Sequence, residues 1–261
     1  MQNLKLTIQY NGSRYLGWQK PDKGSDHKTV SYRITSVLSR MTGAPVVLHA
    51  GAKTEARIHA LAQTVNFQTD SDLSPEEFQS GLNRYLPSDI AVLNCEPVKE
   101  RFRADLNAVS RTYTYRICTA PVYDVFTRAY TAQLYPGPDI AAMETAASFL
   151  IGTHDFRGFS GGRKKKHTQK TILDIRFCSP EQEPGLLVIK LTADDFLYQM
   201  PSLIIGALLE TGQQIRTPAS MEAILQGKKK TETLCDPKGL LLTSVQYESI
   251  HRFKEDGFFT N

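Results

Sequence analysis

The chain has 261 residues, of which 41% are hydrophobic and 22% charged, as in an ordinary globular protein rather than a fibrous or disordered one. No apolar run approaches the roughly 18 residues that a membrane-spanning helix needs, and the N-terminus lacks the apolar centre of a signal peptide, so we expect a cytoplasmic protein. The net charge of +4 is mildly basic and by itself does not identify an anionic partner.

The first hundred residues alternate between strand and helix patterns. In Leu4–Tyr10 apolar residues fall at every second position, which predicts a half-buried strand. In Thr29–Met41 they fall at helical spacing, and Gly43 ends the helix. A second helix begins at Ser74, which forms a predicted capping box with Glu77. Further strands are predicted over residues 45–50, 62–67 and 89–98.

The second half of the chain shows the same order of elements. A strand begins at Arg111, and a helix is predicted over residues 139–150. Two strands joined by the turn-rich stretch 180–185 follow. The remaining predictions are an apolar helix over residues 196–209, a short helix over 219–225 and a final strand over 240–249.

Each half therefore contains a strand, a helix, two strands, a helix and a strand. This order is typical of the ferredoxin-like plan, in which helices cover one face of an antiparallel sheet. We predict an α+β fold of two ferredoxin-like halves, residues 1–105 and 106–261, that form one antiparallel sheet. The cleft between two such halves is a natural place for a ligand.

Two short basic runs concentrate positive charge in predicted loops, at Gly162–His167 and Gly227–Lys230. Such runs are usually solvated surface, but they can also contact phosphates. The four cysteines are widely spaced without a CxxC pair, and the six histidines show no ligand spacing. We therefore predict no metal site.

Several motifs occur in the order and spacing of one known family. They are YNGSRYLGWQ (Tyr10–Gln19), TVSYRI (Thr29–Ile34), HALAQTVNF, LNRYLPSDI, SRTYTYRI, GTHDFRGF and KGLLLTSVQY. Through them the chain resembles the bacterial tRNA pseudouridine synthase A family over nearly its whole length. The resemblance implies a homodimer whose basic central cleft binds RNA, the anticodon arm of tRNA, and isomerises uridine to pseudouridine without metal or cofactor.

The resemblance also implies the catalytic residues, in the stretch GAKTEARIHA (Gly51–Ala60). The family has an aspartate here that acts at C1′ of uridine, an arginine that keeps it ionised and a tyrosine that stacks on the base. In this chain Glu55 occupies the aspartate position and Tyr113 matches the tyrosine. Lys53 replaces an arginine that resembles the base-flipping residue, and Arg57 replaces a glycine.

Other positions depart from the family pattern. The family's FLRHMVRN appears as FLYQMPSL, so the arginine partner aligns with Ser202, which we expect on the helix surface or as an N-terminal cap. The family's FHAR appears as Phe102–Asp105. The extra methylene of Glu55 shifts the carboxylate, and a misplacement of about 1 Å can cost about 10²-fold in rate. Lys53 or Arg57 could replace the missing arginine as its partner.

The candidate RNA-binding residues are Arg14, Lys53, Arg57, Arg163, Lys164, Lys165 and Lys166, whose positive charges can neutralise phosphates. His59 matches the family motif, and we expect it to hydrogen-bond the loop rather than to catalyse.

The sequence leaves three functions open. The first is a synthase that uses Glu55 in place of the aspartate. The second is a catalytically silent relative that still binds structured RNA, and the third is a protein-interaction scaffold. The retained basic loops count against the third. Formation of pseudouridine would separate the first from the second.

Overall fold

A computed structural model describes residues 1–19, 26–162 and 167–247 of the chain. The predicted RNA-binding run Arg163–Lys166 and the last residues of the predicted final strand lie outside these ranges. Within them, no helix is long and apolar enough to cross a membrane.

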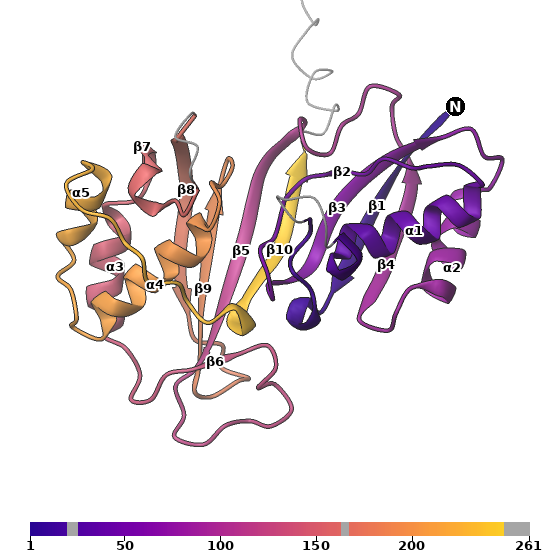
Figure 1. Ribbon diagram of the computed structural model, residues 1–261. Coiled ribbons are helices and arrows are strands. Elements are labelled where there is room, and N and C mark those ends of the chain that lie inside the picture. The colour runs from indigo at the N-terminus through magenta and orange to yellow at the C-terminus, as the bar shows by residue number, and fades with distance from the viewer. Residues whose placement is uncertain (20–25, 163–166, 248–261) are drawn as a thin grey trace, which may run out of the picture.

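The described residues form a ten-stranded, mostly antiparallel sheet (Figure 1). Its order is β4-β1-β3-β10-β5-β9-β8-β7, with β2 paired to β3 and β6 to β5. The contacts of β10 with β3 and of β6 with β5 are parallel. The strands are β1 (Gln2–Tyr10), β2 (His49–Ala50), β3 (His59–Thr69), β4 (Ile90–Pro97), β5 (Ala108–Cys118), β6 (Ala132–Gln133), β7 (Gly152–Asp155), β8 (Gln169–Cys178), β9 (Leu186–Ala193) and β10 (Leu240–Tyr247).

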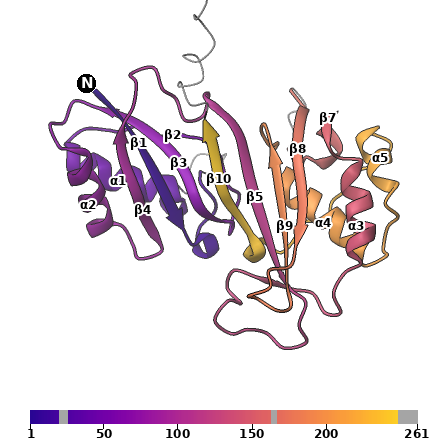
Figure 2. The same ribbon diagram turned by 180° about the vertical axis from the view of Figure 1, so that it is seen from behind.

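The helices lie on one side of this sheet in two groups, as the two opposite views in Figures 1 and 2 show. One group is α1 (Val30–Thr42) with α2 (Pro75–Tyr85), and the other is α3 (Ile140–Ser148), α4 (Met200–Gly212) and α5 (Ser220–Leu225). Strands β5 and β10 lie between the two groups, so none of the described helices lies directly over the middle of the sheet.

The predicted helix boundaries in the first half are confirmed by their caps. The α1 helix begins after Thr29, whose side chain accepts a hydrogen bond from the helix, and it ends at Gly43 in the left-handed region (φ 71°). At α2, the Ser74 hydroxyl and the Glu77 carboxylate each accept from the other residue's backbone N–H, so the capping box is present.

The observed elements differ from the predicted ones in three details. Of the predicted strand 45–50, only His49–Ala50 pairs with β3. The short strands β6 and β7 were not predicted, because two to four residues are too few to show periodicity. The α4 helix begins at Met200 instead of Phe196, because Gln199 has φ 61° and a left-handed residue cannot belong to a right-handed helix.

Candidate active site

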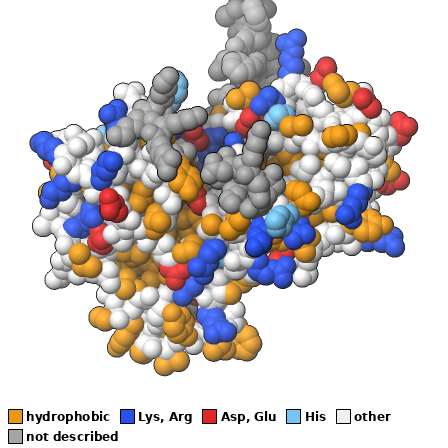
Figure 3. All heavy atoms as spheres, in the orientation of Figure 1, with side chains coloured by type: hydrophobic (Ala, Val, Ile, Leu, Met, Phe, Trp, Pro, Cys, Tyr) orange, Lys and Arg blue, Asp and Glu red, His pale blue; other side chains and the backbone are white. Residues whose placement is uncertain are grey.

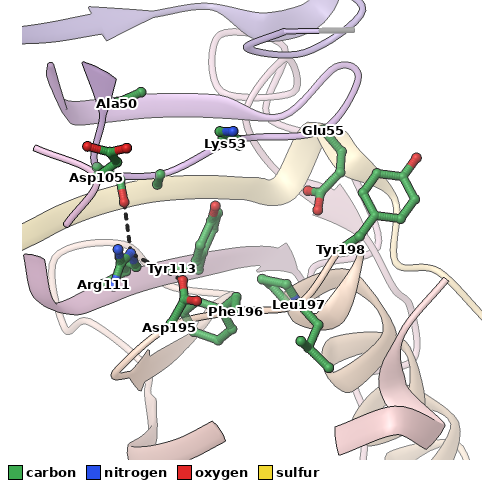
Figure 4. Close-up of a pocket in the computed structure, with 13 residues that line it drawn as sticks. Ala50, Lys53, Glu55, Asp105, Arg111, Tyr113, Asp195, Phe196, Leu197 and Tyr198 are labelled. Atoms are coloured by element: carbon green, nitrogen blue, oxygen red, sulfur yellow. Dashed lines mark hydrogen bonds and ion pairs between the residues drawn. The ribbon is translucent and has the colours of Figure 1, made fainter. Parts of the chain in front are cut away.

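A pocket of about 340 Å³ lies over β5, between the loop that follows β2 and the segment that precedes α4 (Figure 4). The two walls come from opposite halves of the chain, and β5 forms the floor. The lining residues are Ala50, Gly51, Ala52, Lys53, Glu55, Asp105, Arg111, Tyr113, Asp195, Phe196, Leu197, Tyr198 and Pro201.

The structure brings three of the predicted site residues together in this pocket. Glu55 and Lys53 come from the loop after β2, and Tyr113 comes from the floor. Arg57 does not line the pocket, and its side chain is exposed. Arg14 lies in a separate hollow described below.

The loop that carries Glu55 is held by the end of β1 and the segment that follows it. The hydroxyl groups of Tyr10 and Thr54 are 2.7 Å apart, and the carbonyl of Thr54 accepts from the backbone N–H of Trp18 at 2.9 Å. Gly12 donates its N–H to Nδ1 of His59 at 3.1 Å. Through these bonds the motif that contains Tyr10, Gly12 and Trp18 determines where the backbone of the Glu55 loop lies.

The carboxylate of Glu55 has two differently placed oxygens. Oε1 accepts a hydrogen bond of 2.8 Å from the backbone N–H of Gln199. Oε2 is shielded from solvent and has no hydrogen-bond partner among the described residues. Burial raises the pKa of Glu55 above its ordinary value, and the Gln199 N–H partly offsets this effect by favouring the charged form. Neither Lys53 nor Arg57 forms a described ion pair with Glu55.

Tyr113 is buried on the floor of the pocket. Its ring contacts Phe196 edge to face, with ring centroids 5.2 Å apart. Burial and, after it, the negative charge of Glu55 raise the pKa of Tyr113 well above its ordinary value, so the phenol stays protonated at neutral pH. The residue can therefore offer an aromatic face and a hydroxyl proton to a bound base.

Arg111, a residue without a predicted role, joins the two walls of the pocket. Its Nε donates to the carbonyl of Gly51 at 2.8 Å, and its guanidinium also bonds the carbonyl of Asp194. The same Nε lies 3.5 Å from the carboxylate of Asp195, which in turn pairs with Lys170 at 2.6 Å. Arg111 precedes Tyr113 by two positions, so strand alternation was the signal that places it on the same face.

The prediction for Ser202 is wrong. Ser202 is neither a surface residue nor a cap, but is buried in the first turn of α4. Its hydroxyl lies 3.3 Å from the sulfur of Cys235, and its carbonyl accepts from the N–H of Cys235. The short side chain packs into the core there because the segment before β10 covers this part of α4. Pro201 lies in the first helical turn, where its missing N–H is tolerated.

Arg57, where the family pattern has a glycine, lies in a left-handed backbone conformation that favours glycine. Its φ is 67°, a left-handed value that costs a residue with a side chain about 1–2 kcal/mol. Because the side chain is exposed and points to no described partner, we expect Arg57→Gly to raise the free energy of unfolding by up to about 1 kcal/mol, after the higher chain entropy of glycine is subtracted. Urea unfolding of both proteins measures this. A loss of stability would show that the arginine side chain makes a stabilising contact.

His59 serves the loop, as expected, by accepting the hydrogen bond from Gly12. It is almost fully buried, and burial lowers its pKa to about 4 from about 6.5 in the unfolded chain. Because the native state resists protonation, the stability that the neutral ring contributes is complete above pH 6.5 and is lost as the pH falls towards 4.

We therefore expect the melting temperature to fall between about pH 7 and about pH 5, and to fall less in His59→Asn, whose side-chain oxygen can still accept from Gly12. Differential scanning calorimetry at several pH values checks this. His154→Asn is the matched control, because that histidine is not fully buried and its nearest bond is to the carbonyl of Ile151. An unchanged slope in His59→Asn would assign the effect to other groups.

Arg14 lies in a second hollow, apart from the pocket. Lys28 and Arg33 also line this hollow, whose volume is about 460 Å³. Arg14 pairs with Asp89 at 3.0 Å, although its side chain is 74% exposed. Three cations around one concave surface concentrate positive charge there.

Comparisons with known proteins identify the family of this chain. The family model described as tRNA pseudouridine synthase matches residues 6–105 and 146–248. A protein of Bacillus anthracis named tRNA pseudouridine synthase A 2 is 34% identical over 249 residues, which is 95% of this chain and all of the relative. One of the same name from Clostridium tetani is 36% identical over 250 residues, 94% of this chain and 99% of the relative. This chain therefore belongs to the tRNA pseudouridine synthase A family.

Proposed function

We propose that this protein is an active pseudouridine synthase that isomerises uridine in tRNA, with Glu55 as the catalytic carboxylate. The observation that carries the proposal is the unpartnered Oε2 of Glu55, held out of water in a pocket beside Tyr113. A shielded carboxylate oxygen without a partner is unfavourable for folding. Groups of this kind gather at sites where chemistry needs them.

The reaction breaks the C1′–N1 bond of uridine, turns the detached uracil and joins its C5 to C1′. A carboxylate oxygen near C1′ can act as a nucleophile that holds the sugar, or as a base. The C5 proton is finally lost and N1 gains one, so the change is an isomerisation that consumes no oxidant or cofactor. The buried ring of Tyr113 supports the uracil while it turns.

The target base must leave its stack to reach this pocket. Oε2 is shielded from solvent, so side chains at the pocket must move when the ribose enters. Tyr198 is suited to this movement, because its ring stands beside the Glu55 carboxylate in Figure 4 and is 52% exposed. An exposed aromatic ring here can also stack on a nucleotide next to the target.

Basic side chains support binding of the anticodon arm around this pocket. Lys53 is at the pocket and can fill the space that the flipped base leaves, and Arg57 is exposed on the same loop. The hollow at Arg14 supplies further phosphate contacts. We propose the run Arg163–Lys166 as an additional contact. Figure 3 shows several Lys and Arg side chains near the middle of the face that carries the helices.

We propose that the two halves, residues 1–105 and 106–261, are both ferredoxin-like and that RNA binds in the cleft between them. The strand order supports this, because β4-β1-β3-β2 and β10-β5-β9-β8 each follow the chain order four-one-three-two. The pocket has walls from both halves. Because both halves form the cleft, RNA binding needs both of them.

We propose that the protein acts in the cytoplasm as a homodimer. The loop between β5 and β6 exposes apolar side chains that are costly to leave in water, with Phe126 91%, Val122 76% and Val125 64% exposed. Orange side chains gather at this end of the molecule in Figure 3. Light scattering should give the mass of a dimer, and Phe126→Ser should increase the share of monomer. A monomer at all concentrations would contradict the proposal.

The first test is mass spectrometry of pseudouridine in RNA that has been incubated with the purified protein. The RNA should come from cells that lack this gene, and the control is the same RNA without protein. New pseudouridine is expected, and mapping it identifies the target nucleotide. If none forms while tRNA still binds in a salt-dependent manner, the protein is a silent RNA-binding relative instead.

A further inference from the structure

The carboxylate of Glu55 reaches across the pocket to the beginning of α4. It accepts from the N–H of Gln199, 144 positions away in the sequence, at 2.8 Å. Gln199 is the residue before the helix, and its own side chain does not cap α4. Glu55 therefore supplies a negatively charged acceptor at the N-terminus of α4, where backbone N–H groups lack helical partners and favour negative charge. Figure 4 shows the carboxylate directed towards the segment that contains Leu197 and Tyr198.

This contact explains two departures from the family pattern, namely Glu55 at the aspartate position and Ser202 at the arginine position. Ser202, where the resemblance places the arginine, is packed against Cys235 and offers no charge to the pocket. The backbone N–H of Gln199 is present instead. One C–C bond is about 1.5 Å long, so an aspartate at position 55 would leave its oxygen about 4 Å from this N–H, beyond hydrogen-bonding distance. The extra methylene of Glu55 closes that gap.

The left-handed conformation of Gln199 (φ 61°, ψ 5°) directs its N–H towards Glu55 instead of along the helix. Neighbouring residues hold this conformation. The carbonyl of Tyr198 accepts from the N–H of Gly161 at 3.2 Å, and the Gln199 side chain occupies the space where a Cβ of residue 161 would lie, 1.9 Å from Oε1. Gly161 therefore leaves room for a residue in a strained, left-handed conformation.

We propose that Gln199 is a positioning residue: its backbone N–H, at the N-terminus of α4, replaces the arginine side chain as the group that orients Glu55, and its bond to Oε1 leaves Oε2 as the reacting oxygen. This inference rests on the proposed function only for the role of Oε2. The contact itself can be tested without activity.

The first experiment follows the backbone amide resonances in ¹⁵N-labelled full-length protein as the pH is varied. The Gln199 amide is expected to shift as Glu55 titrates, and the shift should disappear in Glu55→Gln. The amide of Phe126, which donates to Asp124 at 2.9 Å, is the internal control and should shift equally in both proteins. A Gln199 amide that shifts identically in both proteins would overturn the proposed contact.

The second experiment compares the kinetics of native protein and Glu55→Asp with tRNA. Although aspartate is the residue that the family resemblance implies, we expect kcat to fall about 10²-fold with KM and melting temperature nearly unchanged, because the carboxylate loses its N–H partner but keeps its charge. Glu181→Asp, at an exposed glutamate of the β8–β9 turn, is the matched control. Native kcat in Glu55→Asp would overturn the positioning role. If the native protein forms no pseudouridine, the proposed function fails and the amide titration alone decides the contact.

Discussion

Glu55→Gln is expected to reduce pseudouridine formation by at least about 10³-fold while the tRNA dissociation constant stays within about twofold of the native value. Glutamine has the shape of glutamate and still offers an oxygen to the N–H of Gln199, so the loop should keep its place. It lacks the negative charge that the reaction needs at C1′. Mass spectrometry of the product and filter binding of tRNA measure the two quantities on the same protein preparations.

The expected loss of product in Glu55→Gln should not arise from a loss of folding stability. Burial raises the pKa of Glu55, so the native state binds its proton more tightly than the unfolded chain does. Its contribution to stability is therefore lost as the pH rises from the ordinary glutamate pKa through the raised one, and Glu55→Gln should be at least as stable as the native protein at about pH 7. Glu181→Gln, at an exposed position, is the matched control for charge. Equal loss of product and of tRNA affinity in Glu55→Gln would contradict a purely chemical role.

Gly12→Ala is expected to destabilise the fold by about 3 kcal/mol or more. A Cβ on Gly12 would lie 1.9 Å from the carbonyl oxygen of Ile58, which is backbone and cannot rotate away. The clash would also strain the hydrogen bond from Gly12 to His59 and move the loop that carries Glu55. A displacement of about 1 Å is enough to lower the rate about 10²-fold. Urea unfolding and product formation measure the two effects.

Gly81→Ala is the matched control for this substitution. Gly81 lies inside α2, and a Cβ there would meet the terminal methyl of Met41, at the flexible end of a side chain that can move. The better helix propensity of alanine offsets the crowding, so stability should stay within about 1 kcal/mol of native. If both variants lose the same stability, crowding at the Glu55 loop is not the cause.

The helices and long strands could be predicted because their patterns are local. The capping box at Ser74 and the alternation of Leu4–Tyr10 depend on residues a few positions apart, and both are present in the structure. The start of α4 could not be predicted in this way. An apolar helical pattern begins at Phe196, but the left-handed Gln199 delays the helix, and this conformation depends on contacts with Gly161 and Glu55.

In the candidate site, too, some features could be predicted from the sequence and others depend on contacts between distant segments. The motifs identified Glu55, Lys53 and Tyr113, and the structure brings all three to one pocket. Alignment with a family pattern could locate the missing arginine at Ser202 but could not show what holds Glu55 instead. A backbone N–H has no sequence signal, because every residue except proline carries one.

By itself, then, the sequence determined the family, most of the secondary structure and which loop carries the carboxylate, since these depend on residue types at short or aligned spacing. Only the tertiary structure decided that Ser202 is buried against Cys235, that Arg111 joins the two walls of the pocket and that Gln199 contacts Glu55. These contacts form between segments far apart in the chain. They depend on how β5, β10 and α4 pack together, and no local pattern records that packing.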